Sequence, residues 1–169
     1  MAVRLSRLLA HLCTGDEAAS IAWPTASETV TRGVSIKASA SYDAAASKPA
    51  KGQWQWKYTV KITNESADTL QLLSRHWVIV EQSGQVLEVG PKASGVLGQQ
   101  PIFRPGESFT YSSACPLSCE VGTLHGSFEM KILEPAESHG RRFEAAIGRF
   151  GLSVDGEEAL MPIVIHEAL

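Results

Sequence analysis

The chain has 169 residues, of which 44% are hydrophobic and 20% charged, with a formal net charge of -3 and a pI near 5.9. This length is enough for one domain with a hydrophobic core and short extensions. The weak negative charge argues against a protein that holds nucleic acid through its overall field, because such domains concentrate positive charge. No run approaches the roughly 20 apolar residues that cross a bilayer, so no membrane span is predicted.

The cysteines number three and lie at Cys13, Cys115 and Cys119. An odd, scattered set is not the even framework of a small secreted domain, so a reducing compartment is expected. Cys115 and Cys119, with His125, have the residue types of a zinc site, but the second matched pair of ligands is missing. The sequence therefore predicts no metal site and no cofactor.

Residues 1–12 have the pattern of a basic amphipathic helix. They carry Arg4, Arg7 and His11 without any acidic residue, and their leucines recur at helical spacing on one face. This pattern is typical of an organelle import signal, and an ordinary surface or docking helix is the alternative. We therefore expect a location in the mitochondrial matrix, with the cytoplasm as the alternative.

Beyond this helix the chain is expected to form short strands. Residues 15–27 are mixed in character and predict a connector. The cleanest strand lies at residues 54–63, where apolar even positions alternate with polar odd positions. Other strands are expected at residues 29–42, 70–81, 86–89 and 141–153, after Pro105-Gly106, and through residues 124–132. Several short strands separated by turn signals, with no strong internal helix, predict an all-β, antiparallel β-sandwich.

The predicted strands divide the chain into three parts. An N-terminal helix and connector occupy residues 1–28, the sandwich occupies residues 29–153, and a C-terminal extension occupies residues 154–169. The apolar segment of this extension is expected to add an edge strand to its own sheet or to dock on a partner. The aromatic residues expected in the core are Trp54, Trp56, Tyr58, Phe109, Phe128 and Phe143.

Three ordered blocks lie in the middle of the chain. They read Leu-Leu-Ser-Arg-His-Trp at 72–77, Gly-Val-Leu-Gly-Gln-Gln-Pro at 95–101 and Pro-Gly-Glu-Ser-Phe-Thr-Tyr-Ser-Ser at 105–113. Cys-Pro-Leu at 115–117, Gly122, Gly-Ser-Phe-Glu-Met at 126–130, Phe143 and the segment 147–152 follow in order. In this order the blocks resemble the ApaG family, and the resemblance covers roughly residues 30–153.

The resemblance implies a fold more firmly than a function. ApaG domains are β-sandwiches of the fibronectin type III or immunoglobulin-like sort, found alone in bacteria and fused to other modules in eukaryotic F-box and polymerase-interacting proteins. No settled catalytic activity comes with the family. The expected architecture is therefore such a sandwich with an N-terminal helix and a C-terminal extension.

The glycine tract at residues 90–98 is the first candidate site. The family pattern Gly-x-Gly-Val-Val-Gly resembles a turn whose backbone N–H groups converge on a phosphate. In this chain the first interval is longer by about three residues, and nothing helical follows as a nucleotide-binding unit requires. Gly95, Gly98 and Gln99 are therefore candidates for anion binding, with a structural sandwich loop as the alternative.

The Arg75-His76-Trp77 segment is the second candidate site. Strand alternation places Arg75 and Trp77 on one face and His76 on the other. An Arg beside a Trp stacks its guanidinium on the indole, which serves packing as often as ligand binding. A role in recognising a partner is the functional interpretation of these three residues, and core packing is the structural one.

Basic residues offer a third candidate surface. Lys57 and Lys61 share the polar face of one predicted strand, and Arg141 and Arg142 begin another. Together they could form a stripe that contacts RNA phosphates. The alternative is an ordinary solvated sheet face.

Three functions from different classes follow. The favoured hypothesis is a non-enzymatic interaction module that acts as a subunit or accessory factor of a larger assembly, such as the mitochondrial ribosome or a respiratory complex. The second is a small-anion, pyrophosphate or nucleotide-binding domain. The third is a hydrolase of dinucleoside polyphosphates, which ranks last because Asp155, Glu157 and Glu158 lie in the extension and not on a rigid frame.

Overall fold

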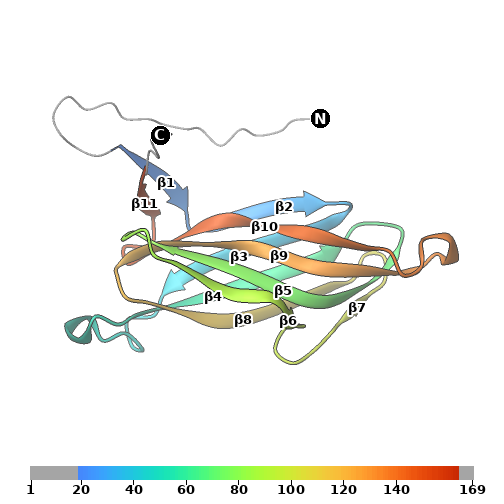
Figure 1. Ribbon diagram of the computed structural model, residues 1–169, viewed down its shortest axis with the longest axis horizontal. Coiled ribbons are helices and arrows are strands. Elements are labelled where there is room, and N and C mark those ends of the chain that lie inside the picture. The colour runs from blue at the N-terminus through green and yellow to red at the C-terminus, as the bar shows by residue number, and fades with distance from the viewer. Residues whose placement is uncertain (1–18, 164–169) are drawn as a thin grey trace, which may run out of the picture.

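The computed structural model describes residues 19–163, which form two facing antiparallel sheets and a two-stranded arm (Figure 1). One sheet has the order β2-β3-β4-β8, with strands Ala26–Thr31, Val34–Tyr42, Trp54–Asn64 and Ser108–Leu117. The other has the order β10-β9-β5-β6, with strands Arg142–Ser153, Val121–Glu134, Thr69–Glu81 and Val86–Ser94, and β7 (Ile102–Phe103) pairs with β5. Two 3-10 turns, η1 (Pro49–Lys51) and η2 (Ala136–Ser138), lie in loops. The predicted all-β antiparallel sandwich is confirmed.

Strand β4 follows its sequence pattern closely. Its even-numbered residues from Trp56 to Ile62 are buried, whereas Lys57, Thr59 and Lys61 are exposed. The strand lies in the middle of its sheet, so one face meets the core and the other meets water. The alternation therefore predicted both the strand and its buried face.

The single strand predicted at residues 29–42 is a hairpin. Arg32 and Gly33 form its turn, with φ angles of 49° and 78°, and Thr31 pairs with Val34. Val30 in the first strand of this hairpin is 60% exposed. The strand was not predicted as a separate element because β2 lies at the edge of the sandwich. Its inward side chains are polar there and form hydrogen bonds with the backbone of β10.

Strand β5 contains a one-residue bulge at Leu73. Leu72 pairs with Met130 of β9, and Ser74 pairs with the adjacent Glu129, so Leu73 has no opposite residue. The extra residue reverses the side-chain phase of the strand. The inward-facing positions are therefore Leu70 and Leu72 before the bulge, and Arg75, Trp77 and Ile79 after it.

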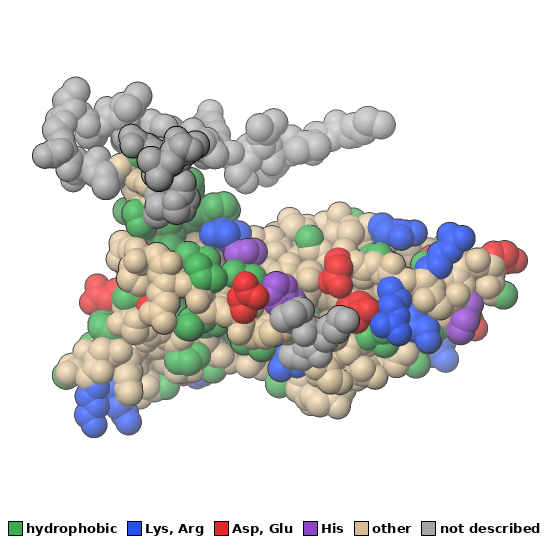
Figure 2. Space-filling view, in the orientation of Figure 1, with side chains coloured by type: hydrophobic (Ala, Val, Ile, Leu, Met, Phe, Trp, Pro, Cys, Tyr) green, Lys and Arg blue, Asp and Glu red, His purple; other side chains and the backbone are tan. Residues whose placement is uncertain are grey.

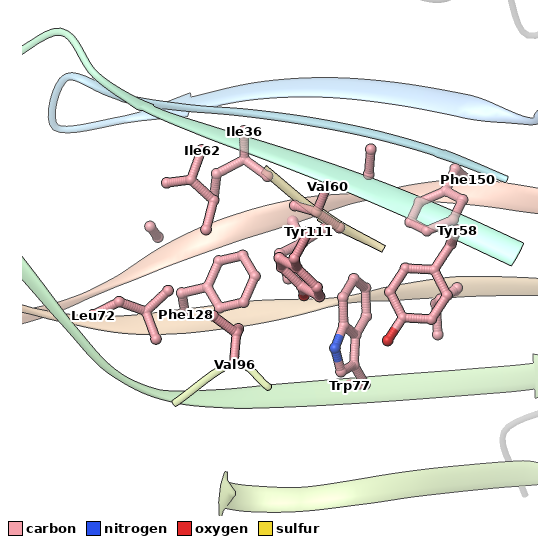
Figure 3. Packing of buried hydrophobic residues seen from close by; sticks show 14 of the residues in the cluster. Ile36, Tyr58, Val60, Ile62, Leu72, Trp77, Val96, Tyr111, Phe128 and Phe150 are labelled. Atoms are coloured by element: carbon pink, nitrogen blue, oxygen red, sulfur yellow. The ribbon is translucent and has the colours of Figure 1, made fainter. Parts of the chain in front are cut away.

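The core lies between the two sheets and is rich in aromatic rings (Figure 3). Trp77 makes edge-to-face contacts with Tyr58, Phe128 and Phe150 at centroid distances of 5.2, 6.3 and 6.3 Å. Such geometry matches the quadrupoles of the rings and adds to the stabilisation from burial. Of the six aromatic residues predicted in the core, Trp54, Phe109 and Phe143 are only partly buried and pack at its rim.

The arm joins the two ends of the described chain. Strand β1 (Ser20–Pro24) pairs antiparallel with β11 (Glu158–Pro162), and the pair stands off one end of the sandwich in Figure 1. It packs against β10 at Gly151, where a Cβ atom would lie 2.4 Å from the Trp23 carbonyl oxygen. The prediction of a connector at residues 15–27 is thus wrong over β1 and the start of β2, and part of the extension pairs within its own chain.

The predicted amphipathic helix falls on residues 1–12, which lie outside the described residues. Within residues 19–163, no helix is long and apolar enough to span a membrane.

Candidate functional site

The glycine turn, defined as residues 94–100, closes on itself. Val96 and Gln99 exchange two backbone hydrogen bonds of 2.9 Å each, and the two residues between them, Leu97 and Gly98, have φ angles of 47° and 75°. Gly95 permits the close approach of the two ends, because a Cβ atom there would lie 2.0 Å from the Gln99 carbonyl oxygen. The turn is therefore a tight loop whose geometry depends on glycine.

Strand β5 holds this turn against the core. The Gly95 N–H and the Gln100 side-chain amide both donate to the Leu73 carbonyl oxygen, at 2.9 and 2.8 Å. Arg75 Nη1 donates to the carbonyl oxygens of Gly95 at 2.6 Å and of Ser94 at 3.2 Å. Val96 is fully buried. The bulge at Leu73 thus provides the acceptor that anchors the turn.

These bonds determine what the glycine turn can do chemically. A phosphate cradle needs several backbone N–H groups that point to a common anion. The N–H groups of Gly95, Val96 and Gln99 already donate to carbonyl oxygens, and Arg75 also donates to carbonyl oxygens of the turn. The structure brings Arg75 and the glycines together, as a binding site would. Their hydrogen bonds, however, go to carbonyl oxygens of the protein and hold the turn so that Val96 is buried in the core.

Trp77 belongs to the core and not to a surface site. Its side chain is 2% exposed, and its indole nitrogen, like the Tyr111 hydroxyl, has no hydrogen-bond partner among the described residues. Burial raises the pKa of Tyr58 and of Tyr111, and the nearby positive charge of Arg75 opposes both shifts only in part. The two phenols therefore stay neutral and act as packing groups.

His76 lies on the opposite face of β5 and contacts solvent. Its Nε2 atom is 3.3 Å from a carboxylate oxygen of Glu88 on β6. On the same outer face, Arg149 of β10 approaches two side chains of β9: its Nη1 donates to Thr123 Oγ1 at 3.3 Å, and its Nη2 lies 3.4 Å from His125 Nε2. The Arg149 guanidinium also covers the ring of Trp23 in the arm, 5.1 Å from its centroid.

We call these five residues, Trp23, His76, Thr123, His125 and Arg149, the foot patch. Figure 2 shows basic and histidine side chains together on the visible face, just below the arm. Of the five, only His76 was predicted from the sequence as a binding residue, and His125 was considered there only as part of a zinc site. No local signal could have found the group, because its members come from β1, β5, β9 and β10.

His125 is held neutral in this patch. Burial lowers its pKa, and the positive charges of Arg149 and then of His76 lower it further. An arginine only donates hydrogen bonds, so the facing Nε2 is the acceptor and the ring proton is assigned to Nδ1. That Nδ1 atom is buried and has no hydrogen-bond partner among the described residues.

The basic residues do not form one stripe. Lys57 and Lys61 lie on the outer face of β4, whereas Arg142 begins β10 in the other sheet and Arg141 precedes it. Lys57 pairs with Asp43 at 2.8 Å and lowers the pKa of that carboxyl group. Arg142 pairs with Glu129 at 3.0 Å. Two of the four charges are therefore engaged with carboxylates on different faces of the molecule.

The sulfur atoms and His125 also lie apart. Cys115 is buried in the core, and burial, assisted by Glu81, raises the pKa of its thiol to about 12. Cys119 donates from Sγ to the Val121 carbonyl oxygen at 3.1 Å, and His125 faces outward. Within residues 19–163, no group of three or more His, Cys, Asp or Glu side chains is arranged to hold a metal ion.

The two ends of the β10-β9-β5-β6 sheet differ. At the β10 edge, hydroxyl groups of β2 form hydrogen bonds with the β10 backbone. Ser27 donates to the Gly148 carbonyl oxygen at 2.7 Å, and the Ala146 N–H donates to Thr31 Oγ1 at 3.2 Å. At the β6 end, no other described strand pairs with the outer side of Val86–Ser94. This open edge carries three exposed apolar residues, Val86, Leu87 and Val89, which are 54%, 39% and 40% exposed.

The fold defines an antiparallel sandwich domain with one sheet edge closed and one open. Its sequence places it more closely: the model of the ApaG domain family matches residues 44–132, and the chain belongs to this family. The expected resemblance is confirmed.

Relatives and a solved structure agree with this assignment. A Protein ApaG from Methylobacterium sp. (strain 4-46) is 43% identical over 124 residues, which are 73% of this chain and 90% of that protein. One from Bradyrhizobium sp. (strain ORS 278) is 40% identical over 132 residues, 78% of this chain and 96% of that protein. The crystal structure of the putative ApaA protein from Bordetella pertussis is similar, with a TM-score of 0.65, 34% identity, and coverage of 77% of this chain and 97% of that one.

These relatives correct the expected location. They are bacterial proteins, from Methylobacterium, Bradyrhizobium and Brucella. Bacteria have no mitochondria into which such proteins could be imported. The prediction of a mitochondrial matrix location is therefore wrong, and it rested only on the composition of residues 1–12.

Proposed function

We propose that this chain is a non-enzymatic interaction module of ApaG type that acts as a subunit or accessory factor of a larger assembly. An extended segment of a partner protein would pair along the open edge of β6. The observation that carries this proposal is the contrast between the two ends of one sheet, because the β10 backbone is occupied by β2 hydroxyls and the β6 backbone is not.

The hydrogen-bond alternation of the sheet identifies the backbone groups that a partner would meet. The Glu81 N–H donates toward β6, to the Gln85 carbonyl oxygen, at 2.9 Å, and the Gln82 N–H donates toward β9, to the Val121 carbonyl oxygen, at 3.0 Å. Ile79 lies two residues before Glu81, so it also directs its backbone N–H and carbonyl toward β6. Leu87 pairs with Ile79, and the backbone groups of Leu87 therefore point at β5. The neighbouring Glu88 therefore directs its N–H and carbonyl outward.

Strand addition suits this edge for two physical reasons. Unpaired backbone groups supply the hydrogen bonds that give such complexes their affinity, and neighbouring apolar side chains supply contact area. Val86, Leu87 and Val89 provide that area along one continuous strand. The second hypothesis, anion binding by the glycine turn, has weaker support because the N–H groups of Gly95, Val96 and Gln99 already have carbonyl acceptors.

A proline substitution at Glu88 tests the proposal. Glu88→Pro removes the outward N–H without removing a bond to β5, and Glu88→Ala is the matched control because both variants lose the contact with His76. In native lysates of the source cells, the wild-type chain and the Ala variant are expected to sediment in a particle larger than the 18.2 kDa monomer. The Pro variant is expected to sediment as the free chain, with an unchanged far-UV circular dichroism spectrum.

Two results would contradict the proposal. The first is a wild-type chain that sediments only as a free 18.2 kDa species. The second is a folded Pro variant that remains in the particle as fully as the Ala variant, which would place the contact elsewhere.

A further inference from the structure

Arg149 is a half-buried cation without a counter-charge among residues 19–163. Its two hydrogen bonds go to neutral acceptors, Thr123 Oγ1 and His125 Nε2, and no carboxylate within residues 19–163 forms an ion pair with it. A guanidinium has five N–H donors. The remaining three donors of Arg149 therefore have no hydrogen-bond partner among the described residues.

The surroundings fix the orientation of this guanidinium. Thr123 is fully buried, so its hydroxyl is a rigid acceptor. His125 Nε2 accepts a hydrogen bond from Arg149 Nη2, and the Trp23 ring covers the flat face of the guanidinium. A guanidinium that is held at its face and at two of its N–H groups presents its free donors in a preset direction, which favours planar recognition of an oxyanion.

Neighbouring charges determine which oxyanion fits. His76 of the foot patch faces the Glu88 carboxylate at 3.3 Å, so this pair brings no net positive charge to the patch. Burial and the Arg149 charge keep His125 neutral by lowering its pKa. Arg149 is therefore the permanent positive charge of the foot patch. A singly charged carboxylate neutralises it, whereas a phosphate dianion would leave an excess negative charge near the Glu88 carboxylate.

Strand β10 itself provides a comparison. Arg142 also lies on the outer side of this strand, and it pairs with Glu129 at 3.0 Å. Among the described residues, the arginine at one end of this strand thus has a carboxylate partner and the arginine near the other end has none. The missing partner at Arg149 is a property of the foot patch and not of arginines on this sheet.

We propose that the foot patch is a carboxylate-binding site in which Arg149 is the anion ligand and Thr123, His125 and Trp23 position its guanidinium. The carboxylate has two sources, a free organic acid and an acidic residue of a bound peptide. The foot patch meets the open edge only at the contact between His76 and Glu88, and Arg149 takes no part in that contact. The two proposals therefore have separate tests, and either can fail without the other.

Nuclear magnetic resonance titration of the full-length chain tests this site. The probes are acetate, a capped tetrapeptide with one Glu, the same peptide with Gln, and inorganic phosphate. The readouts are the Arg149 Nε–H and His125 ring signals. Acetate is expected to shift both signals saturably, the Gln peptide is expected to shift neither, and phosphate is expected to bind more weakly than acetate.

Matched arginine variants locate the site. Arg149→Gln is expected to weaken carboxylate binding by about tenfold or more, whereas Arg142→Gln is expected to change it by less than about twofold, because Arg142 already has a carboxylate. Arg149→Lys keeps the charge but loses the planar fork, and an intermediate affinity is expected. The wild-type titration supports or overturns the proposal even if the Gln variant does not fold.

The remaining outcomes distinguish a free organic acid from a peptide carboxylate, or overturn the proposal. Tighter binding of the Glu peptide than of acetate identifies a peptide-borne carboxylate, and equal or weaker binding identifies a free acid. Unmoved Arg149 signals, tighter binding of phosphate than of acetate, or an equal loss of affinity in the Arg142 variant would each overturn it.

Discussion

Gly126 is a residue of β9 that leaves no room for a side chain beside β5. A Cβ atom at this position would be 1.9 Å from the His76 carbonyl oxygen and 3.1 Å from the Trp77 Cα atom. Both of these atoms belong to backbone, so neither can rotate away. The absence of a side chain at Gly126 therefore lets β5 approach β9 with Trp77 in the core and His76 on the outer face.

Substitution of this glycine should be costly. We expect Gly126→Ala to lower the free energy of unfolding by about 3 kcal/mol, because the strands must separate to accept a methyl group. Gly90→Ala is the control: a Cβ atom there meets nothing within 4 Å, so a change within about 0.5 kcal/mol is expected. Urea unfolding followed by tryptophan fluorescence gives both values. Equal stability of the two variants would show that the sheet accommodates the methyl group.

At the scale of elements, the glycine turn and the bulge in β5 form one unit. The extra residue Leu73 offers its carbonyl oxygen to Gly95 and Gln100, and the same bulge sets the phase that points Arg75 at the turn. The turn in turn seats Val96 in the core. The unit thus closes the core beneath β5, which explains the glycine pattern without a bound phosphate.

Neighbouring residues of the turn allow a direct test of this role. Val96 is fully buried and Leu97 is 61% exposed. We expect Val96→Ala to lower the free energy of unfolding by about 2 kcal/mol through lost contacts and a cavity, and Leu97→Ala to change it by less than about 0.5 kcal/mol. Chemical denaturation measures both. A larger effect at Leu97 than at Val96 would contradict a structural role for the turn.

At the scale of the whole molecule, the arm is attached to a sandwich that is already complete. Within residues 19–163, strand β11 pairs with β1 and with no strand of the two core sheets. Its Ala159 and Met161 are nevertheless buried, at 0% and 7% exposure, and it covers the outer face of β10 near Gly151. The arm is therefore expected to contribute to stability without determining the fold.

Removal of residues 158–169 tests this division. We expect the shortened chain to keep a β-rich circular dichroism spectrum and to melt about 10 °C lower, because the core sheets keep their pairs while the face under Met161 becomes exposed. Leu160→Ala, at a residue that is 53% exposed, is expected to melt within about 2 °C of the wild type. A random-coil spectrum of the shortened chain would instead place β11 in the folding core.

Some parts of the structure could be predicted because they depend on local pattern. Strand β4 is an inner strand with one face on the core and the other in solvent. The alternation of apolar and polar residues along it therefore identified its buried side chains. Strand β2 could not be found in this way, because Ser27 and Thr31 face the β10 backbone and are polar on their inner side. The bulge at Leu73 also carries no Gly or Pro signal, and only the pairing with β9 reveals it.

The sequence by itself determined that this chain is an antiparallel sandwich of the ApaG family, since periodicity and the order of motifs are properties of the chain alone. Only the tertiary structure decided that three N–H groups of the glycine turn donate to carbonyl oxygens, and that the outer edge of β6 has no partner among the described strands. It also decided that Arg149 meets residues of β1 and β9 in the foot patch. These are relations between strands distant in sequence, and their hydrogen-bond partners and charges become defined only when the strands pack together.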